Sequence, residues 1–199
     1  MNLQKLSSFN RDSALEFLRI EQLLSWEIRA TPIKISAFFE ERLERLHRNF
    51  ALYNSESAKE LLIDAFCEEA LERRSQLQAW KEAPLRSDTL TGFVDYLIAQ
   101  KRAYLGPPLL CVVEAKKDDF EQGTAQCLVS MDACAWQNAQ KQHVIPVFGV
   151  VTNGSGWQFY QRDSQGAYSE SVLFTSGDAP HLLGALDFIF AECEKSLVS

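Results

Sequence analysis

The chain has no C-x-x-C pair, although it contains five cysteines, an odd number. Structural zinc sites need closely spaced cysteines or histidines, so a site of this kind is not expected. Most of the cysteines lie among apolar or helical neighbours, where a free thiol behaves as a small hydrophobic side chain. This usage predicts a protein of a reducing compartment.

Long apolar segments are missing as well. No uninterrupted apolar run approaches the roughly 20 residues that a helix needs to cross a bilayer. The charged start of the chain, Met1–Lys5, is not followed by the apolar stretch of a signal peptide. The sequence therefore predicts a soluble cytoplasmic protein without membrane partners.

The sequence also lacks two kinds of catalytic motif, the phosphate-binding loop and the histidine-based nucleophile motif. There is no G-x-x-x-x-G-K-[ST] segment, so neither a phosphate-binding loop nor a built-in motor is expected. The three histidines, His47, His143 and His181, are scattered, and none stands beside a serine or cysteine in a recognisable nucleophile motif. These absences argue against nucleotide-driven motors and triad hydrolases.

An excess of basic residues is also lacking, because the formal net charge is -7. Proteins that grip nucleic acid usually present a basic surface, since phosphate neutralisation supplies most of their non-specific affinity. The middle of the chain nevertheless gathers Lys and Arg, at positions 73, 74, 81, 86, 101, 102, 116 and 117. A local basic surface is therefore compatible with the overall acidity.

What is present fits one α/β domain. A chain of 199 residues that is 46% hydrophobic can bury one sizeable core. Helical and strand periodicities alternate along it. Helices are expected near 13–24, 36–50, 57–74, 118–141 and 180–195, and strands near 77–80, 91–99, 109–113, 144–152, 157–162 and 171–175. We expect a mixed central sheet flanked by helices over residues 56–199, with residues 1–55 as an N-terminal helical extension packed on that core.

The start of the third expected helix has two interpretations. Ser57 followed three residues later by Glu60 fits a capping box, in which the glutamate satisfies backbone N–H groups. Alternatively, Glu60 is an acid at the rim of a functional site. The spacing alone leaves both open.

Three polar residues interrupt the two most apolar strands. Asp95 lies within the run 91–99, and the run 109–117 carries Glu114-Ala115-Lys116 near its end. Because a strand alternates its faces with period two, Glu114 and Lys116 project the same way. Charged groups on such apolar strands are costly unless something compensates them. A divalent cation held by Asp95 and Glu114, with Lys116 beside it, would do so.

Phosphodiester hydrolysis uses this set of residue types. Mg²⁺ prefers oxygen ligands and keeps several waters, so one or two carboxylates can hold it. The metal activates a water and stabilises charge on the phosphate. A lysine close to the metal can position the water or stabilise the developing charge. A surface acid and an ordinary salt bridge are the alternative interpretation of the same residues.

Here the chain resembles the PD-(D/E)XK restriction-endonuclease-like superfamily. The match is Asp95, eighteen intervening residues, and Glu114-Ala115-Lys116 at the end of an apolar strand. The stretch 113–117, followed by Gln122-Gly123-Thr124-Ala125-Gln126, is most similar to the nuclease domain of type I restriction motor subunits. The resemblance covers roughly residues 57–162 and departs from the family name at Val94, where proline would precede the acid.

The resemblance implies a Mg²⁺-dependent nuclease, with Mn²⁺ as a substitute metal and DNA as substrate. By it, Asp95 and Glu114 are metal ligands and Lys116 is the catalytic lysine. Glu60 is then the helical acid of the first motif, and Gln126 supports the site. Since no motor or reader domain is present, a homodimer or a partner protein would supply targeting. The alternative is a catalytically inactive protein of the same fold that acts as an interaction or regulatory module.

Two further sets of residues have two interpretations each. Gln122 and Gln126 share one helix face and either reach the proposed site or lie on the solvent side. Four aromatic residues, Trp136, Trp157, Phe159 and Tyr160, either stack bases or belong to the core.

Overall fold

A mixed sheet runs through the centre of the computed structural model, which describes residues 3–52, 54–116 and 120–198. The described residues form five α-helices: α1 (Arg11–Leu18), α2 (Ala37–Asn49), α3 (Glu56–Leu71), α4 (Phe120–Ala139) and α5 (Ala179–Lys195). They also form nine strands: β1 (Gln4–Lys5), β2 (Leu24–Ser25), β3 (Leu77–Arg86), β4 (Leu90–Gln100), β5 (Leu109–Ala115), β6 (Val147–Thr152), β7 (Gly156–Arg162), β8 (Tyr168–Glu170) and β9 (Phe174–Thr175). The expected α/β class with a mixed central sheet flanked by helices is confirmed.

The sheet follows the order β1-β4-β5-β6-β7-β8-β2, with β3 added beside β4 and β9 beside β7. Neighbours in the middle are antiparallel except β5 and β6, which are parallel and are joined through α4. A parallel pair needs such a crossover connection. Every residue of β5 is buried, as expected for a strand that is covered on both faces.

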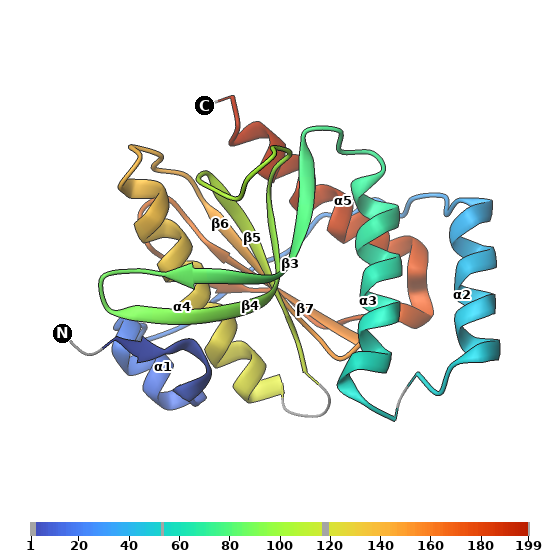
Figure 1. Cartoon of the computed structure of the whole chain (residues 1–199), viewed down its shortest axis with the longest axis horizontal. Helices are drawn as coiled ribbons and strands as arrows, with labels where there is room; N and C mark the ends of the chain where they lie inside the picture. Colours follow the sequence, from blue (N-terminus) through green and yellow to red (C-terminus); the bar gives the residue numbers. More distant parts are fainter. Residues whose placement is uncertain (1–2, 53, 117–119, 199) are drawn as a thin grey trace.

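Two layers of helices cover the sheet. Helices α1 and α4 lie on one side; α3 and α5 lie on the other, with α2 outermost against α3 (Figure 1). Each side has its own apolar core. The α4-side core includes Val112 and Leu97, whereas the α3-side core includes Val113 and Tyr96. Consecutive residues of one strand thus serve opposite cores, as the period of two requires.

The helix starts differ from the sequence-based prediction in two places. Helix α1 begins two residues before the expected start at residue 13, because Asn10 caps it: its side chain accepts the backbone N–H of Ser13, whose hydroxyl accepts the N–H of Asn10 in return. Ser55, rather than Ser57, caps α3 by accepting the N–H of Ala58. The Ser57 capping box is therefore wrong, because serine two positions earlier already satisfies the first turn.

Helix α1 is shorter than predicted, because Arg19 adopts a left-handed conformation with φ 55° and ends it. Leu24, the expected end of this helix, instead pairs with β8 together with Ser25, as strand β2. The predicted start of α4 at Asp118 lies outside the described residues.

Strand β3 is longer than predicted. The sequence predicted a strand only near residues 77–80, but the strand continues to Arg86, and Pro84 lies within it, opposite Phe93. Proline is tolerated there because β3 lies at an edge of the sheet, where a missing N–H breaks no ladder. The predicted edge strand at 171–175 is also displaced, since β8 ends at Glu170 and β9 covers only Phe174–Thr175.

A reversal in the middle of β3 positions the candidate site. Glu82 has φ 48°, a left-handed conformation that is unusual for a residue with a side chain. Before it, Leu77 packs in the α3-side core; after it, Ala83 and Leu85 pack in the α4-side core. The strand therefore turns over at Glu82. The residue of β4 opposite this reversal, between the pairs Lys81–Tyr96 and Ala83–Val94, is Asp95.

The N-terminal segment adds more than helices, because β1 joins the sheet beside β4 and α1 packs against α4. None of the helices in the described ranges combines the length and apolarity that crossing a membrane requires.

Candidate functional site

The register of β4 and β5 brings Asp95 to Glu114. The two strands pair through Tyr96–Val113 and Leu97–Val112. One step further along this antiparallel register, Asp95 stands opposite Glu114. In place of a further ladder bond, the carboxylate of Asp95 accepts the backbone N–H of Ala115 at 2.6 Å through Oδ2. The two predicted carboxylates therefore meet on one side of the sheet.

Glu114 is the most unusual group in this arrangement. Its side chain is fully buried, and neither carboxyl oxygen has a hydrogen-bond partner among the described residues. Burial, followed by the charge of Asp95, raises the pKa of the Glu114 carboxyl well above its ordinary value, while Lys116 acts in the opposite direction. An ionised carboxylate in this position requires compensation from a cation or further donors.

Lys116 lies between the two acids. Its Nζ is 3.8 Å from Oδ2 of Asp95 and 3.8 Å from Oε2 of Glu114. The Lys116 side chain is only 18% exposed, whereas the Asp95 side chain is 33% exposed, so the cluster opens to solvent on the aspartate side. This places an ammonium group beside the accessible end of the acid pair.

Gly123 makes room for the lysine. A Cβ atom there would stand 2.9 Å from Cγ of Lys116 and 2.7 Å from Cγ1 of Val151. Helix α4 can therefore approach β5 and β6 this closely only because residue 123 has no side chain. The position of Lys116 thus depends on the helix that follows it in the chain.

The two glutamines of α4, Gln122 and Gln126, contact different parts of the protein. Gln126 is 7% exposed, and its side-chain amide lowers the pKa of Glu114, which places it beside that carboxyl. Gln122 instead donates from Nε2 to the carbonyl of Ser7 at 3.4 Å. The solvent-side interpretation therefore fails for Gln126, the residue that the resemblance assigns to the site.

The structure does not bring Glu60 to the other four residues. Its carboxylate is 3.3 Å from Nζ of Lys81, which also lies 3.1 Å from each carboxyl oxygen of Asp64. The hydroxyl of Tyr96 donates to Oδ1 of Asp64 at 2.9 Å. Tyr96 belongs to the α3-side core, so this cluster lies on the opposite side of the sheet from Glu114.

The cluster of Glu60, Asp64 and Lys81 was not anticipated from the sequence. One signal was available: Glu60 and Asp64 are four residues apart on one helix and therefore share a face. Their lysine partner comes from β3 and is seventeen residues beyond Asp64. Nothing local in the sequence predicts that contact.

The aromatic residues also separate. Trp157, Phe159 and Tyr160 are buried, which confirms that these three aromatic residues belong to the core. Trp136 is only partly buried and lines a cavity.

Asp95 and Glu114 fit a magnesium ion in their donor chemistry. Both described contacts of Asp95 use Oδ2, and both oxygens of Glu114 lack hydrogen-bond partners in the described structure. Within the described ranges there is no cluster of three or more His, Cys, Asp or Glu suited to a metal. Two carboxylates are nevertheless sufficient for Mg²⁺, because this ion keeps several of its waters.

No protein-family model matches this chain, and no curated protein matches it significantly. Any functional assignment therefore depends on the residues themselves.

Proposed function

We propose that this protein is a metal-dependent nuclease with a restriction-endonuclease-like core, which hydrolyses phosphodiester bonds in DNA. One observation carries the proposal: a fully buried glutamate, Glu114, has no hydrogen-bond partner in the described structure and lies beside Asp95 and Lys116. Strongly perturbed acids of this kind concentrate at functional sites.

In the proposed enzyme, Asp95 and Glu114 hold Mg²⁺, for which Mn²⁺ can substitute. When bound, the metal supplies a water that is more readily deprotonated and positive charge for the phosphate. It also provides the compensation that an ionised Glu114 requires in its buried position.

The remaining residues position the reacting groups. The ammonium of Lys116, within 3.8 Å of both carboxylates, can donate hydrogen bonds to the attacking water or to a phosphate oxygen. Gln126 of α4 lies beside the Glu114 carboxyl and lowers its pKa. The N–H of Ala115 holds the Asp95 carboxylate.

A cleavage assay tests this assignment. Purified protein is incubated with supercoiled plasmid and with single-stranded DNA, in the presence of Mg²⁺, Mn²⁺ or a chelator. We expect metal-dependent cleavage that Glu114→Ala and Lys116→Ala abolish. Equal cleavage by the variants would show that another site or a contaminant is responsible. Calorimetric absence of Mg²⁺ and Mn²⁺ binding would reject the metal site itself.

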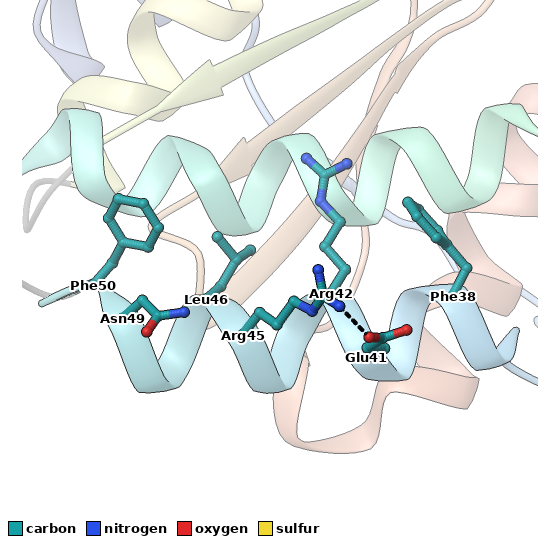
Figure 2. Close-up of a pocket in the computed structure, with 7 residues that line it drawn as sticks. All are labelled: Phe38, Glu41, Arg42, Arg45, Leu46, Asn49 and Phe50. Atoms are coloured by element: carbon teal, nitrogen blue, oxygen red, sulfur yellow. Dashed lines mark hydrogen bonds and ion pairs between the residues drawn. The ribbon is translucent and has the colours of Figure 1, made fainter.

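A second candidate function, an inactive protein of this fold that acts as an interaction module, is favoured by the surface of α2. Phe38 and Phe50 are 62% and 53% exposed. They stand at the two ends of a cavity of about 300 Å³, with Leu46 between them (Figure 2). Exposed apolar surface of this kind often marks an interface.

A second copy of the chain suits this surface, because α2 carries acids and bases in alternation. Arg45 pairs with Glu41 within the helix, and Arg42 pairs with Glu68 of α3. An antiparallel copy of α2 would bring acidic positions opposite basic ones and cover both phenylalanines. Sedimentation of wild-type protein and the Phe38→Ser/Phe50→Ser variant tests this: a dimer that the variant dissociates supports it. A monomeric wild-type protein would show that a second copy of the chain does not cover this surface.

A further inference from the structure

A cavity of about 270 Å³ lies beside the C-terminal half of α4, and its lining includes none of the residues of the Glu114 cluster. Its lining combines Asp132, Trp136 and His143 with Arg162 of β7 and Ser164 of the following turn. The size is close to the lower end of small-molecule sites, which combine apolar walls with a few convergent polar groups.

Arg162 is held in one orientation at this cavity. Its Nε lies 3.5 Å from Oδ1 of Asp132, and its guanidinium carbon is 5.8 Å from the ring centroid of Tyr168. The side chain is 22% exposed. An acid and an aromatic ring therefore flank the guanidinium of Arg162, which is one of the residues that line the cavity.

Arg162 meets its acid partner through one of its donors. Nε lies 3.5 Å from Oδ1 of Asp132, although among the described residues neither this buried Nε nor the buried hydroxyl of Tyr168 makes a hydrogen bond of good geometry. A guanidinium has five N–H donors, four of them on the two terminal nitrogens. An acceptor from outside the chain would pair with that terminal fork.

The nearby acid contacts one edge of the guanidinium. Burial raises the pKa of the Asp132 carboxyl, while Arg162 acts in the opposite direction. Asp132 orients the guanidinium through Nε, and an oxyanion would pair with the terminal nitrogens instead.

The other walls favour a flat apolar body. Trp136 presents an indole ring that is only partly buried, beside Ala135 and Ala139. Val144 at the rim is 71% exposed. An aromatic or otherwise planar group against Trp136 would cover this apolar surface.

We propose that this cavity binds a small organic anion, with a carboxylate or phosphate group on Arg162 and a flat apolar body against Trp136. The planar fork of arginine matches both oxyanions in a bidentate arrangement. This site is separate from the proposed nuclease centre, and its occupancy does not depend on that function.

An NMR titration of the full chain tests the proposal. Benzoate, phenyl phosphate and the neutral benzamide are added at matched ionic strength, and the indole N–H of Trp136 and the amide of Ser164 are followed. We expect saturable shifts with an anion, and at least about tenfold weaker binding of benzamide. The two anions distinguish carboxylate from phosphate. No saturable shift at millimolar concentrations, or equal binding of benzamide, would overturn the proposal.

Two variants test the residues. Arg162→Lys keeps a positive charge facing Asp132 but loses the planar fork, and Ala139→Leu narrows the cavity without changing charge. Each should weaken binding of the anion at least about tenfold. Arg48→Lys, at an exposed position of α2, is the matched control and should bind as wild type does. Thermal unfolding establishes that each variant is folded. Unchanged affinity in both cavity variants would reject this location.

Discussion

Two clusters of acids and a lysine lie on opposite sides of the same strands, and they differ in how well the protein satisfies them. On the α3 side, Lys81 lies within 3.3 Å of three carboxyl oxygens of Glu60 and Asp64. On the α4 side, Lys116 is 3.8 Å from each of its acids, and Glu114 has no hydrogen-bond partner in the described structure.

The two clusters also differ in how far their side chains are exposed to solvent. The side chains of Glu60 and Lys81 are 32% and 45% exposed, so water completes their hydrogen bonding, whereas Glu114 is fully buried. Short contacts and access to water describe a structural ion network of modest energetic value. A buried and poorly bonded acid is instead costly, and departures of this kind from local rules are expected at functional or strained sites.

The largest expected contrast is in DNA cleavage. We predict that Glu114→Gln reduces the rate by about 10³-fold, as loss of a group that stabilises the transition state does. Glu60→Gln, the matched change on the other side of the sheet, should alter it by less than about twofold. Single-turnover cleavage of a labelled duplex measures both. Comparable losses in the two variants would mean that the clusters do not differ in function.

In the absence of metal, we expect Glu114→Gln to raise the free energy of unfolding, although it lowers the cleavage rate, and Glu60→Gln to show no such gain. Because the raised pKa of Glu114 favours its protonated form in the folded chain, the stability from this group is complete below its ordinary value of 4.5. This contribution to stability is lost as the pH rises through the pKa that Glu114 has in the folded chain. Glu114→Gln should therefore exceed wild type in free energy of unfolding by about 2 kcal/mol near pH 8.

Urea unfolding in the presence of a chelator, at about pH 5 and about pH 8, measures this gap. The gap should widen with pH for Glu114→Gln and stay constant for Glu60→Gln. Added Mg²⁺ should narrow it at the higher pH by stabilising wild type alone. A gap independent of pH would show that Glu114 is not destabilised by ionisation.

Removing an acid from the satisfied cluster should affect stability alone. Asp64→Ala deprives the Tyr96 hydroxyl of its acceptor and Lys81 of its nearest acid. We expect a loss of about 1–2 kcal/mol in the free energy of unfolding, with the cleavage rate unchanged. Chemical denaturation together with the duplex assay checks both. A large loss of cleavage in a folded Asp64→Ala variant would extend the active site to the α3 side.

The smallest expected effect concerns the residue at which β3 passes from one core to the other. Glu82 has φ 48°, which glycine adopts without the steric cost of a Cβ atom. Glu82→Gly should therefore raise the free energy of unfolding by about 0.5 kcal/mol, whereas Glu82→Ala should not. Denaturation midpoints of the two variants decide this. If the glycine variant is no more stable than the alanine variant, the backbone at Glu82 is not strained.

The meeting of Asp95 and Glu114 could be predicted because it depends on local rules. Both residues interrupt apolar strands that are close in sequence, and the period of two limits where their side chains point. Ser36 likewise caps α2 close to its predicted start. Glu60 could not be placed in this way, since its neighbours depend on which face of the sheet α3 covers.

The sequence by itself determined the helices and main strands, and the acids and lysine of the α4-side cluster, because periodicity and residue type are local properties. Tertiary structure alone decided that Glu114 is buried without a hydrogen-bond partner among the described residues and that Glu60 pairs with Lys81. Desolvation depends on every element that covers a group, here α4 as well as the sheet. Segments far apart in the chain, such as α4 and β7 at Arg162, meet only when the layers pack.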